Sequence, residues 1–358
     1  MALLDLRPQA ARRTPEQLLH HLKHFDLDLK FSTGIWFHEP NSPALSIEQR
    51  LEIAGRLKEY GLRGLEAHYP GEINYENLEL WKTYARETGL RLITIVPLLS
   101  GDRKFAWGSL SSPLPEVRRE AIERTKEALA LNRQLNTDFA VVRTGIDGHV
   151  HPFGIDFPTL REQFMDALAE AMDGVPGVRV AFQPGPYEPR GHLLFDTTAE
   201  GLILGSKVEN LLRAHENHHI LSEGHALCCL NPEIRQGPED LPAAYAWPLS
   251  EGRLAHVHMN AGMIAAEELE ALLYLLKTHS YQGYFGIDAG SGQMPAESAM
   301  QSGMDAVRAA NDRINQLDHE SILYAVNHPD RAHGWLEAYL IRMRSPQPER
   351  LRKLPPLR

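Results

Sequence analysis

Polar side chains at the ends of short apolar runs are the residues in this sequence that could do chemistry. Gln183 follows the buried-strand pattern of residues 180–182 and precedes a loop rich in proline and glycine. A polar group at the carboxyl end of a strand, held by a stiff loop, is how barrel enzymes place a side chain over their site. An ordinary proline-rich turn explains this pattern equally well. Asp288 ends a similar apolar run, residues 284–287.

Histidines form a second group of candidates. His68 stands at the end of a strand-like run, directly before a turn with Pro70 and Gly71. His256 and His258 lie on one face of another run, because strand side chains alternate with a period of two. Histidine changes its charge near neutral pH and serves as acid, base or metal ligand. A lone histidine is more often structural, and both interpretations stay open for His68 on the residues alone.

Arg143 lies near the end of the fourth strand-like run. A charged arginine at a buried strand end needs a partner, because an isolated buried charge is costly. It either binds an acidic or otherwise different substrate, or pairs with Asp147 or Asp288 as part of the scaffold.

Strand-like and helical patterns alternate along the chain, and this alternation determines the expected fold. The strand-like runs are residues 29–36, 64–68, 90–97, 139–144, 180–183, 219–225, 254–260 and 284–288. The helical patterns between and before them include residues 15–24, 77–88, 115–135 and 199–214. A further helix begins at Ser46, where Gln49 completes a capping box. Eight such runs predict an α/β fold, a (β/α)8 TIM barrel, in preference to an open sheet.

The expected domain organisation is one barrel with additions at both ends. Residues 1–27 read as an N-terminal lead-in, 28–300 as the barrel, and 301–358 as a C-terminal helical arm. The arm is too long for a single closing helix, so we expect it to contribute to oligomerisation.

Composition limits the class of protein. The chain has 358 residues, 43% of them hydrophobic and 23% charged, which is normal for a soluble globular protein. A net charge of −10 argues against a nucleic-acid partner, including for a repair nuclease of similar fold. The longest apolar runs are strand-length, so we expect no membrane partner. The cysteines, Cys228 and Cys229, are adjacent and poorly placed to pair, so we expect a cytoplasmic protein.

The stretch around Gln183 resembles the fifth strand and loop of the xylose isomerases. Residues 184–191 match their pattern Pro-x-Pro-x-Glu-Pro-Arg-Gly, and residues 31–36 match the Phe-Ser-x-Gly-x-Trp of their first strand. Two departures lie at chemically important positions. The family has a metal-binding Glu where this chain has Gln183, and a catalytic Lys where it has Gly185.

The resemblance implies one divalent metal ion, Mn2+, Co2+ or Mg2+. Its ligands would come from the ends of strands five to eight. The implied ligands are Gln183, Glu223, His258 and Asp288. Ser222 stands where counting along the family's Glu-x-Gly-His motif would place the carboxylate, so Glu223 substitutes only if the strand end bulges or twists. Rhamnose isomerases and ketose epimerases, which share this fold, also use histidine at strand seven.

A second metal is not expected, because the family's Asp-x-Asp pair is missing from residues 261–265. By the same resemblance, His68 and Arg190 are catalytic residues, with His68 contacting the ring oxygen of the sugar. Arg143 is added to them as a departure, since it stands where the family has a pocket Trp. The expected substrate-binding residues are Trp36, Phe105, Trp107, His225 and His256.

Together these features predict a divalent-metal-dependent sugar isomerase, acting by aldose–ketose isomerisation or epimerisation on a small-molecule carbohydrate. The alternative is a barrel that has lost its metal and serves as a non-catalytic or partner-dependent subunit. In either case the arm suggests a homo-oligomer, a tetramer or dimer.

Overall fold

The protein is described by a computed structural model. It describes Leu6 and residues 13–37, 44–100, 102–106, 108–143, 147–149, 153–184, 192–195, 197–214, 226–234, 241–260, 266–288 and 294–343. Within these residues no helix is both long and apolar enough to cross a membrane.

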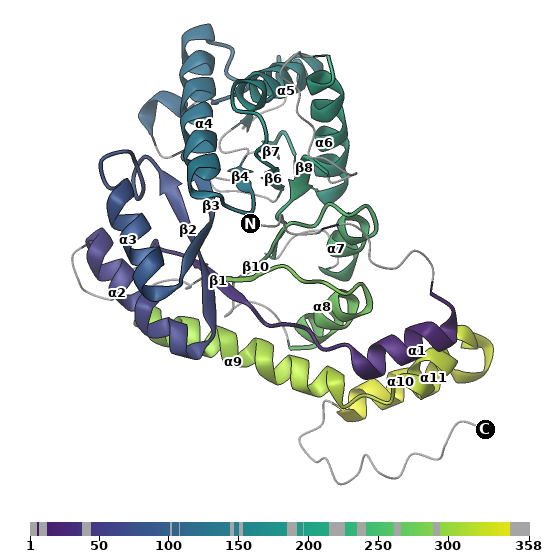
Figure 1. Ribbon diagram of the computed structural model, residues 1–358. Coiled ribbons are helices and arrows are strands. Elements are labelled where there is room, and N and C mark those ends of the chain that lie inside the picture. Colours follow the sequence, from purple (N-terminus) through teal and green to yellow (C-terminus); the bar gives the residue numbers. More distant parts are fainter. Residues whose placement is uncertain are drawn as a thin grey trace.

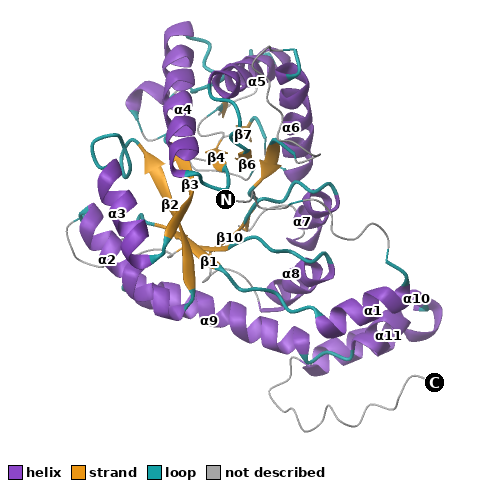
Figure 2. Ribbon diagram, in the orientation of Figure 1, coloured by secondary structure: helices purple, strands orange, loops and turns teal. Residues whose placement is uncertain are grey.

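Eight parallel strands among the described residues form a barrel with helices outside it (Figures 1 and 2). The strands are β1 (Phe31–Gly34), β2 (Leu62–Tyr69), β3 (Arg91–Pro97), β4 (Ala140–Arg143), β6 (Val180–Gln183), β8 (Cys228–Leu230), β10 (Val257–Asn260) and β11 (Phe285–Asp288). Three short strands lie outside this set: β5 (Gly148–His149), β7 (His192–Leu193) and β9 (Glu233–Ile234). The TIM-barrel prediction is therefore confirmed.

Two hydrogen-bonded sheets, with strand orders β3-β2-β1-β11-β10-β9 and β4-β6-β8, make up the barrel wall. Backbone hydrogen bonds join them at both seams. The amide of Asp138 donates to the carbonyl of Ile93 at 3.0 Å beside β3 and β4. At the other seam, the amide of Ala255 donates to the carbonyl of Leu230 at 2.9 Å.

The helices follow the strands along the chain as the sequence patterns predict. They are α1 (Pro15–His24), α2 (Ile47–Leu57), α3 (Leu78–Thr88), α4 (Pro115–Leu135), α5 (Phe157–Gly174), α6 (Thr198–Leu212), α7 (Leu241–Ser250), α8 (Ala266–Thr278), α9 (Ala296–Asn315), α10 (His319–Asn327) and α11 (Pro329–Met343). The capping box of Ser46 and Gln49 is present at the start of α2, so its expected boundary is confirmed.

Apolar residues fill both sides of the barrel wall. One cluster joins Ile93, Val141, Ala181, Cys229 and Ala255 from successive strands, as expected for the packed interior of a barrel. Two larger clusters lie between strands and helices. Residues 180–183 of β6 are all buried, which explains why this strand reads as a continuous apolar run instead of an alternating one.

The C-terminal helices are present, and one of them, α9, spans the expected boundary at residue 300. Helix α9 begins at Ala296 and buries Met300, Met304 and Val307. It packs along α8 and α2, as the eighth barrel helix should (Figure 1). Helices α10 and α11 follow it and pack against each other, and α10 lies beside α1 (Figure 1).

The sixth barrel strand is the main difference from the sequence-based expectation. Cys228–Leu230 pairs in parallel with β6 and occupies this position, whereas the predicted residues 219–225 lie outside the described part of the chain. The polar residue that follows strand six is therefore Asn231. The chain then forms β9, whose Glu233 lies in register with His258 on β10.

Candidate active site

His258, the second residue of β10, and Asp288, the last residue of β11, have side chains that approach each other. His258 Nε2 lies 4.0 Å from Asp288 Oδ2, too far for a hydrogen bond. Neither ring nitrogen of the buried His258 has a hydrogen-bond partner within the described part of the chain. Gly286 makes this arrangement possible, because a Cβ there would lie 2.6 Å from His258 Cδ2. A buried imidazole without a hydrogen-bond partner, facing a carboxylate, has the donor and acceptor capacity to bind a ligand.

Glu66 is a site residue that the sequence analysis missed. Its side chain is buried at 2% exposure on β2, and its Oε1 lies 4.0 Å from His258 Nε2. Ser32 donates a hydrogen bond to this oxygen at 3.3 Å. Burial raises the pKa of Glu66, and Asp288 adds to that shift, whereas His258 and Arg143 oppose it. The signal was available, because Glu66 precedes His68 by two residues and shares its strand face.

His68 belongs to a chain of charged partners at the end of β2. Its Nδ1 lies 3.1 Å from Glu72 Oε2, and its backbone amide donates to the same oxygen at 2.8 Å. Arg50 donates to the other oxygen of Glu72 at 3.0 Å. Since an ionised carboxylate only accepts, the proton of this contact lies on Nδ1, and in the neutral imidazole Nε2 is then the acceptor nitrogen.

Trp36 lies between these two groups. Its indole ring packs against the ring of His68 with centroids 4.5 Å apart. Its Nε1 donates to Asp288 Oδ1 at 2.9 Å. Arg143 lies over the same ring at 5.9 Å from the centroid.

Polar side chains from β4, β6 and the end of β8 meet on the other side of the barrel mouth. Arg143 Nε donates to Gln183 Oε1 at 2.9 Å, and Asn231 Nδ2 approaches the same oxygen at 3.5 Å. The buried Asn231 Oδ1 has no hydrogen-bond partner among the described residues. The oxygen of Gln183 is thus engaged by two donors, and its role as a metal ligand stays a prediction.

Asp147, one of the scaffold partners considered for Arg143, is engaged elsewhere. It is fully buried and accepts the amides of Ser109 and Ser111 at 2.7 and 2.9 Å, together with both hydroxyl groups. Burial raises the pKa of Asp147, and these hydrogen bonds oppose the shift. Asp147 thus ties the loop before α4 to the end of β4.

Two expected substrate-binding residues, His256 and Phe105, are fully buried. His256 is fully buried, and its Nε2 lies 2.8 Å from Ser32 Oγ. Burial holds the pKa of His256 well below its ordinary value, and His258 adds to this. Phe105 is also fully buried, in an apolar cluster with Leu99 outside the barrel wall. Their role in substrate binding stays a prediction, and their burial was not visible in sequence spacing, which does not give depth along a strand or loop.

Several other candidates lie outside the described residues: Trp107, Gly185, Glu188, Arg190, Ser222, Glu223 and His225. The reassignment of strand six bears on Glu223, which precedes this strand instead of following it. Glu233 is the acidic residue whose backbone lies beside His258 at that strand end.

The donor set fits a divalent ion in part. Among the described residues, no three His, Cys, Asp or Glu side chains form a metal-binding group. His258 and Asp288 nevertheless leave an unpartnered imidazole nitrogen and a carboxylate oxygen facing each other. Imidazole and carboxylate donors suit ions such as Mn2+ and Co2+. These two residues would hold the ion, with Gln183 and Asn231 as neighbouring candidates.

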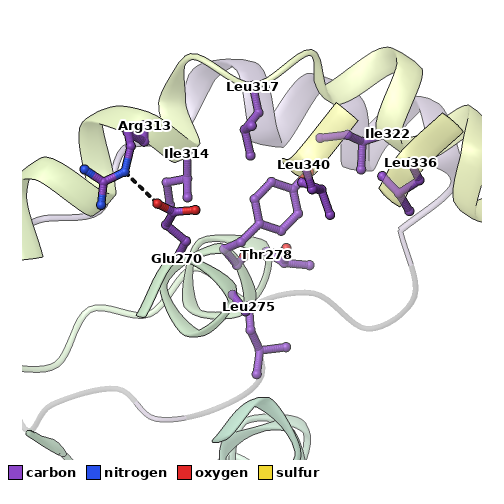
Figure 3. Close-up of a pocket in the computed structure, with 11 residues that line it drawn as sticks. Glu270, Leu275, Thr278, Arg313, Ile314, Leu317, Ile322, Leu336 and Leu340 are labelled. Carbon is purple, nitrogen blue, oxygen red and sulfur yellow. Dashed lines mark hydrogen bonds and ion pairs between the residues drawn. The ribbon is translucent and has the colours of Figure 1, made fainter. Parts of the chain in front are cut away.

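A separate pocket lies in the helical layer, away from the strand ends. It encloses about 360 Å3 between α8 and the helices α9, α10 and α11 (Figure 3). Apolar side chains such as Leu317, Ile322 and Leu340 line most of it. Its charged residues, Glu270 and Arg313, pair with each other at 2.6 Å.

A family profile described as xylose isomerase-like TIM barrel matches residues 54–310. Xylose isomerase from Thermus thermophilus is 26% identical over 294 residues, covering 73% of this chain and 72% of the relative. The Thermus caldophilus xylose isomerase is 27% identical over 292 residues, with the same coverage.

Two solved structures share the fold. The 3-keto-D-glucoside 4-epimerase from E. coli superposes with a TM-score of 0.57 at 18% identity, covering 80% of this chain and all of the other. An L-ribulose 3-epimerase superposes with a TM-score of 0.55 at 16% identity, covering 80% and 95%. At these identities the likeness concerns the fold alone.

Proposed function

Because the chain belongs to the xylose isomerase-like TIM barrel family, we propose that it is a divalent-metal-dependent sugar isomerase or epimerase acting on a monosaccharide-like substrate. The observation that carries this proposal is the His258–Asp288 pair, with its unpartnered imidazole, beside the His68–Glu72 pair. The names of the relatives support the reaction class, since they include both sugar isomerases and sugar epimerases.

His258 and Asp288 would hold the metal, which we propose to be Mn2+, Co2+ or Mg2+. When bound, such an ion polarises substrate oxygens and so stabilises negative charge that develops during the reaction. Asp288 already has one oxygen fixed by Trp36, and the other faces His258. The chain's own contribution is a donor pair held in place by neighbouring side chains.

His68 would move the proton that opens the sugar ring. Glu72 fixes the proton on Nδ1, which leaves Nε2 as the base, and Arg50 fixes Glu72. Carboxylate support of this kind sets the tautomer and orientation of a catalytic histidine. The stacked indole of Trp36 keeps the imidazole at the edge of the pocket.

One observation favours the alternative of a barrel without metal. Gln183 stands where the family carries an anionic ligand, and Arg143 donates a hydrogen bond to its oxygen. A fixed cation therefore lies next to this position. A positive charge near a divalent ion weakens its binding. Protein that is folded but takes up no Mn2+ would support this alternative.

The proposed activity can be tested by following sugar interconversion with 13C NMR. The purified protein would be incubated with Mn2+ and a panel of aldoses and ketoses that includes D-xylose, L-ribulose and D-allulose. We expect new resonances of an isomer or epimer from at least one sugar, abolished by chelator. If the metal-loaded protein converts none of the sugars in a wide panel, the proposal is contradicted.

We propose that α10 and α11 contribute to a homo-oligomer, a dimer or tetramer. Both helices carry exposed apolar residues, with Val326 58% and Ile341 67% exposed. Deleting the chain from Asp318 onward, or the single substitution Ile341→Glu, should lower the particle mass in light scattering. A deletion from residue 344 serves as the control. The number of chains per particle is the particle mass divided by the mass of one chain, and the same number in all variants would contradict the proposal.

The buried free thiols of Cys228 and Cys229 support a cytoplasmic location.

A further inference from the structure

We propose that Trp36 is a positioning residue for Asp288, and that it links the His68 and His258 sides of the site. This inference rests on the proposed function, because it concerns how the donor pair is held. The family resemblance gives Trp36 only the role of a pocket wall. The structure adds a polar role, since its indole N–H donates to Asp288 Oδ1 at 2.9 Å.

The hydrogen bond leaves Asp288 one orientation that serves the site. With Oδ1 held by the indole, Oδ2 is the oxygen that faces His258 Nε2 at 4.0 Å. The side chain of Asp288 is 17% exposed, so solvent reaches it and burial alone does not fix its rotamer. Partners that orient a ligating carboxylate are a general feature of metal sites.

The position of the indole is itself determined by three neighbours. His68 packs against the ring with centroids 4.5 Å apart, and Arg143 lies over it at 5.9 Å. Gly34 provides the space beneath it, because a Cβ there would lie 2.1 to 2.2 Å from three ring atoms. Any larger residue at position 34 would therefore displace the indole.

These contacts make Trp36 the bridge between the two halves of the site. The His68 half is anchored through Glu72 and Arg50, and the Asp288 half through the strand end of β11. A displaced indole releases Asp288 and removes the surface against which His68 packs. The inference therefore predicts that changes at Trp36 and at Gly34 have the same effect on metal binding.

The test uses Mn2+ alone, titrated by calorimetry into the full-length protein and two variants. Trp36→Phe keeps an aromatic ring but removes the N–H, and Gly34→Ala displaces the whole indole. Both should weaken Mn2+ binding by about 10- to 100-fold, the range typical for lost partners of metal ligands. Trp247→Phe, at a 65% exposed position, is the matched control and should leave the affinity unchanged. Trp36→Phe with wild-type affinity would overturn the inference while leaving the proposed function intact.

A second measurement decides the inference if wild-type protein takes up no Mn2+, a result that would remove the metal from the proposed function. The chain has 5 tryptophans, and the indole 15N–1H resonance of Trp36 is the one missing in Trp36→Phe. In Asp288→Ala it should shift away from its hydrogen-bonded position, whereas Asp305→Ala should leave it unmoved. An unshifted resonance in Asp288→Ala would show that no such hydrogen bond exists and would overturn the inference.

Discussion

Alanine at His258 or at Asp288 will lower the kcat/KM of sugar interconversion by at least about 10³-fold. Each substitution removes a donor from the proposed metal site, and Lewis-acid polarisation by a bound ion supplies several kcal/mol of transition-state stabilisation. Since about 1.4 kcal/mol corresponds to a factor of ten in rate, the loss reaches three powers of ten or more. The measurement is kcat/KM at saturating Mn2+, on the sugar that the wild-type protein converts.

Controls separate this effect from a general loss of structure. His20→Ala and Asp166→Ala change residues of the same types at exposed positions on α1 and α5, and should leave kcat/KM unchanged. Thermal unfolding shows whether His258→Ala still folds, since this buried residue also contributes to packing. A folded His258→Ala protein with wild-type turnover would contradict the assignment of the site.

Alanine at Asp147 will destabilise the protein by about 3–5 kcal/mol, because it leaves several buried N–H and O–H donors unsatisfied, at a cost of roughly 1–3 kcal/mol each. Asp147 is fully buried, and its carboxylate accepts the amides and the hydroxyl groups of both Ser109 and Ser111. Asp147→Ala leaves these donors in the interior without an acceptor. Asp147→Asn retains only one oxygen and turns an N–H2 group toward the same donors, so it should also be strongly destabilising.

Urea unfolding followed by circular dichroism measures this change in the free energy of unfolding. Asp166→Ala, which removes an exposed carboxylate from α5, should stay within about 0.5 kcal/mol of the wild type. A similarly small effect for Asp147→Ala would show that the loop before α4 does not depend on this carboxylate.

Much of the barrel is predictable because its local signals agree with its tertiary structure. Helices α1 and α4 have the predicted bounds, Pro15–His24 and Pro115–Leu135. Each begins with a proline in its first turn, where the missing N–H costs nothing. Strand β6 also ends at Gln183 as predicted, because an apolar run is followed at once by proline.

Strand six could not be located in the same way. The observed strand, Cys228–Leu230, is a short buried run without alternation, and periodicity cannot identify such a strand. The motif that ends in Glu223 and His225 drew the prediction to an earlier segment. Asn231 and Glu233 were consequently overlooked, although both follow an apolar run as Gln183 does.

The sequence predicts which residue types form the candidate site, but it does not predict how deep in the barrel each side chain lies. His256 and His258 share a strand face, yet His256 bonds to Ser32 in the barrel interior whereas His258 lies next to Asp288. Sequence spacing gives the face of a strand and not the level at which a side chain enters the barrel. Glu66 was missed for a related reason, since it lies inside an apolar run where a core residue is expected.

The most direct test of the central claim is a calorimetric titration of metal-free protein with Mn2+ near neutral pH. We predict one ion bound per chain by the wild type, and no measurable binding by His258→Ala or Asp288→Ala. The three proteins would be compared at equal concentration, after circular dichroism has shown that each is folded. Absence of binding by the wild type, or equal binding by all three proteins, would contradict the claim that these two residues hold a metal ion.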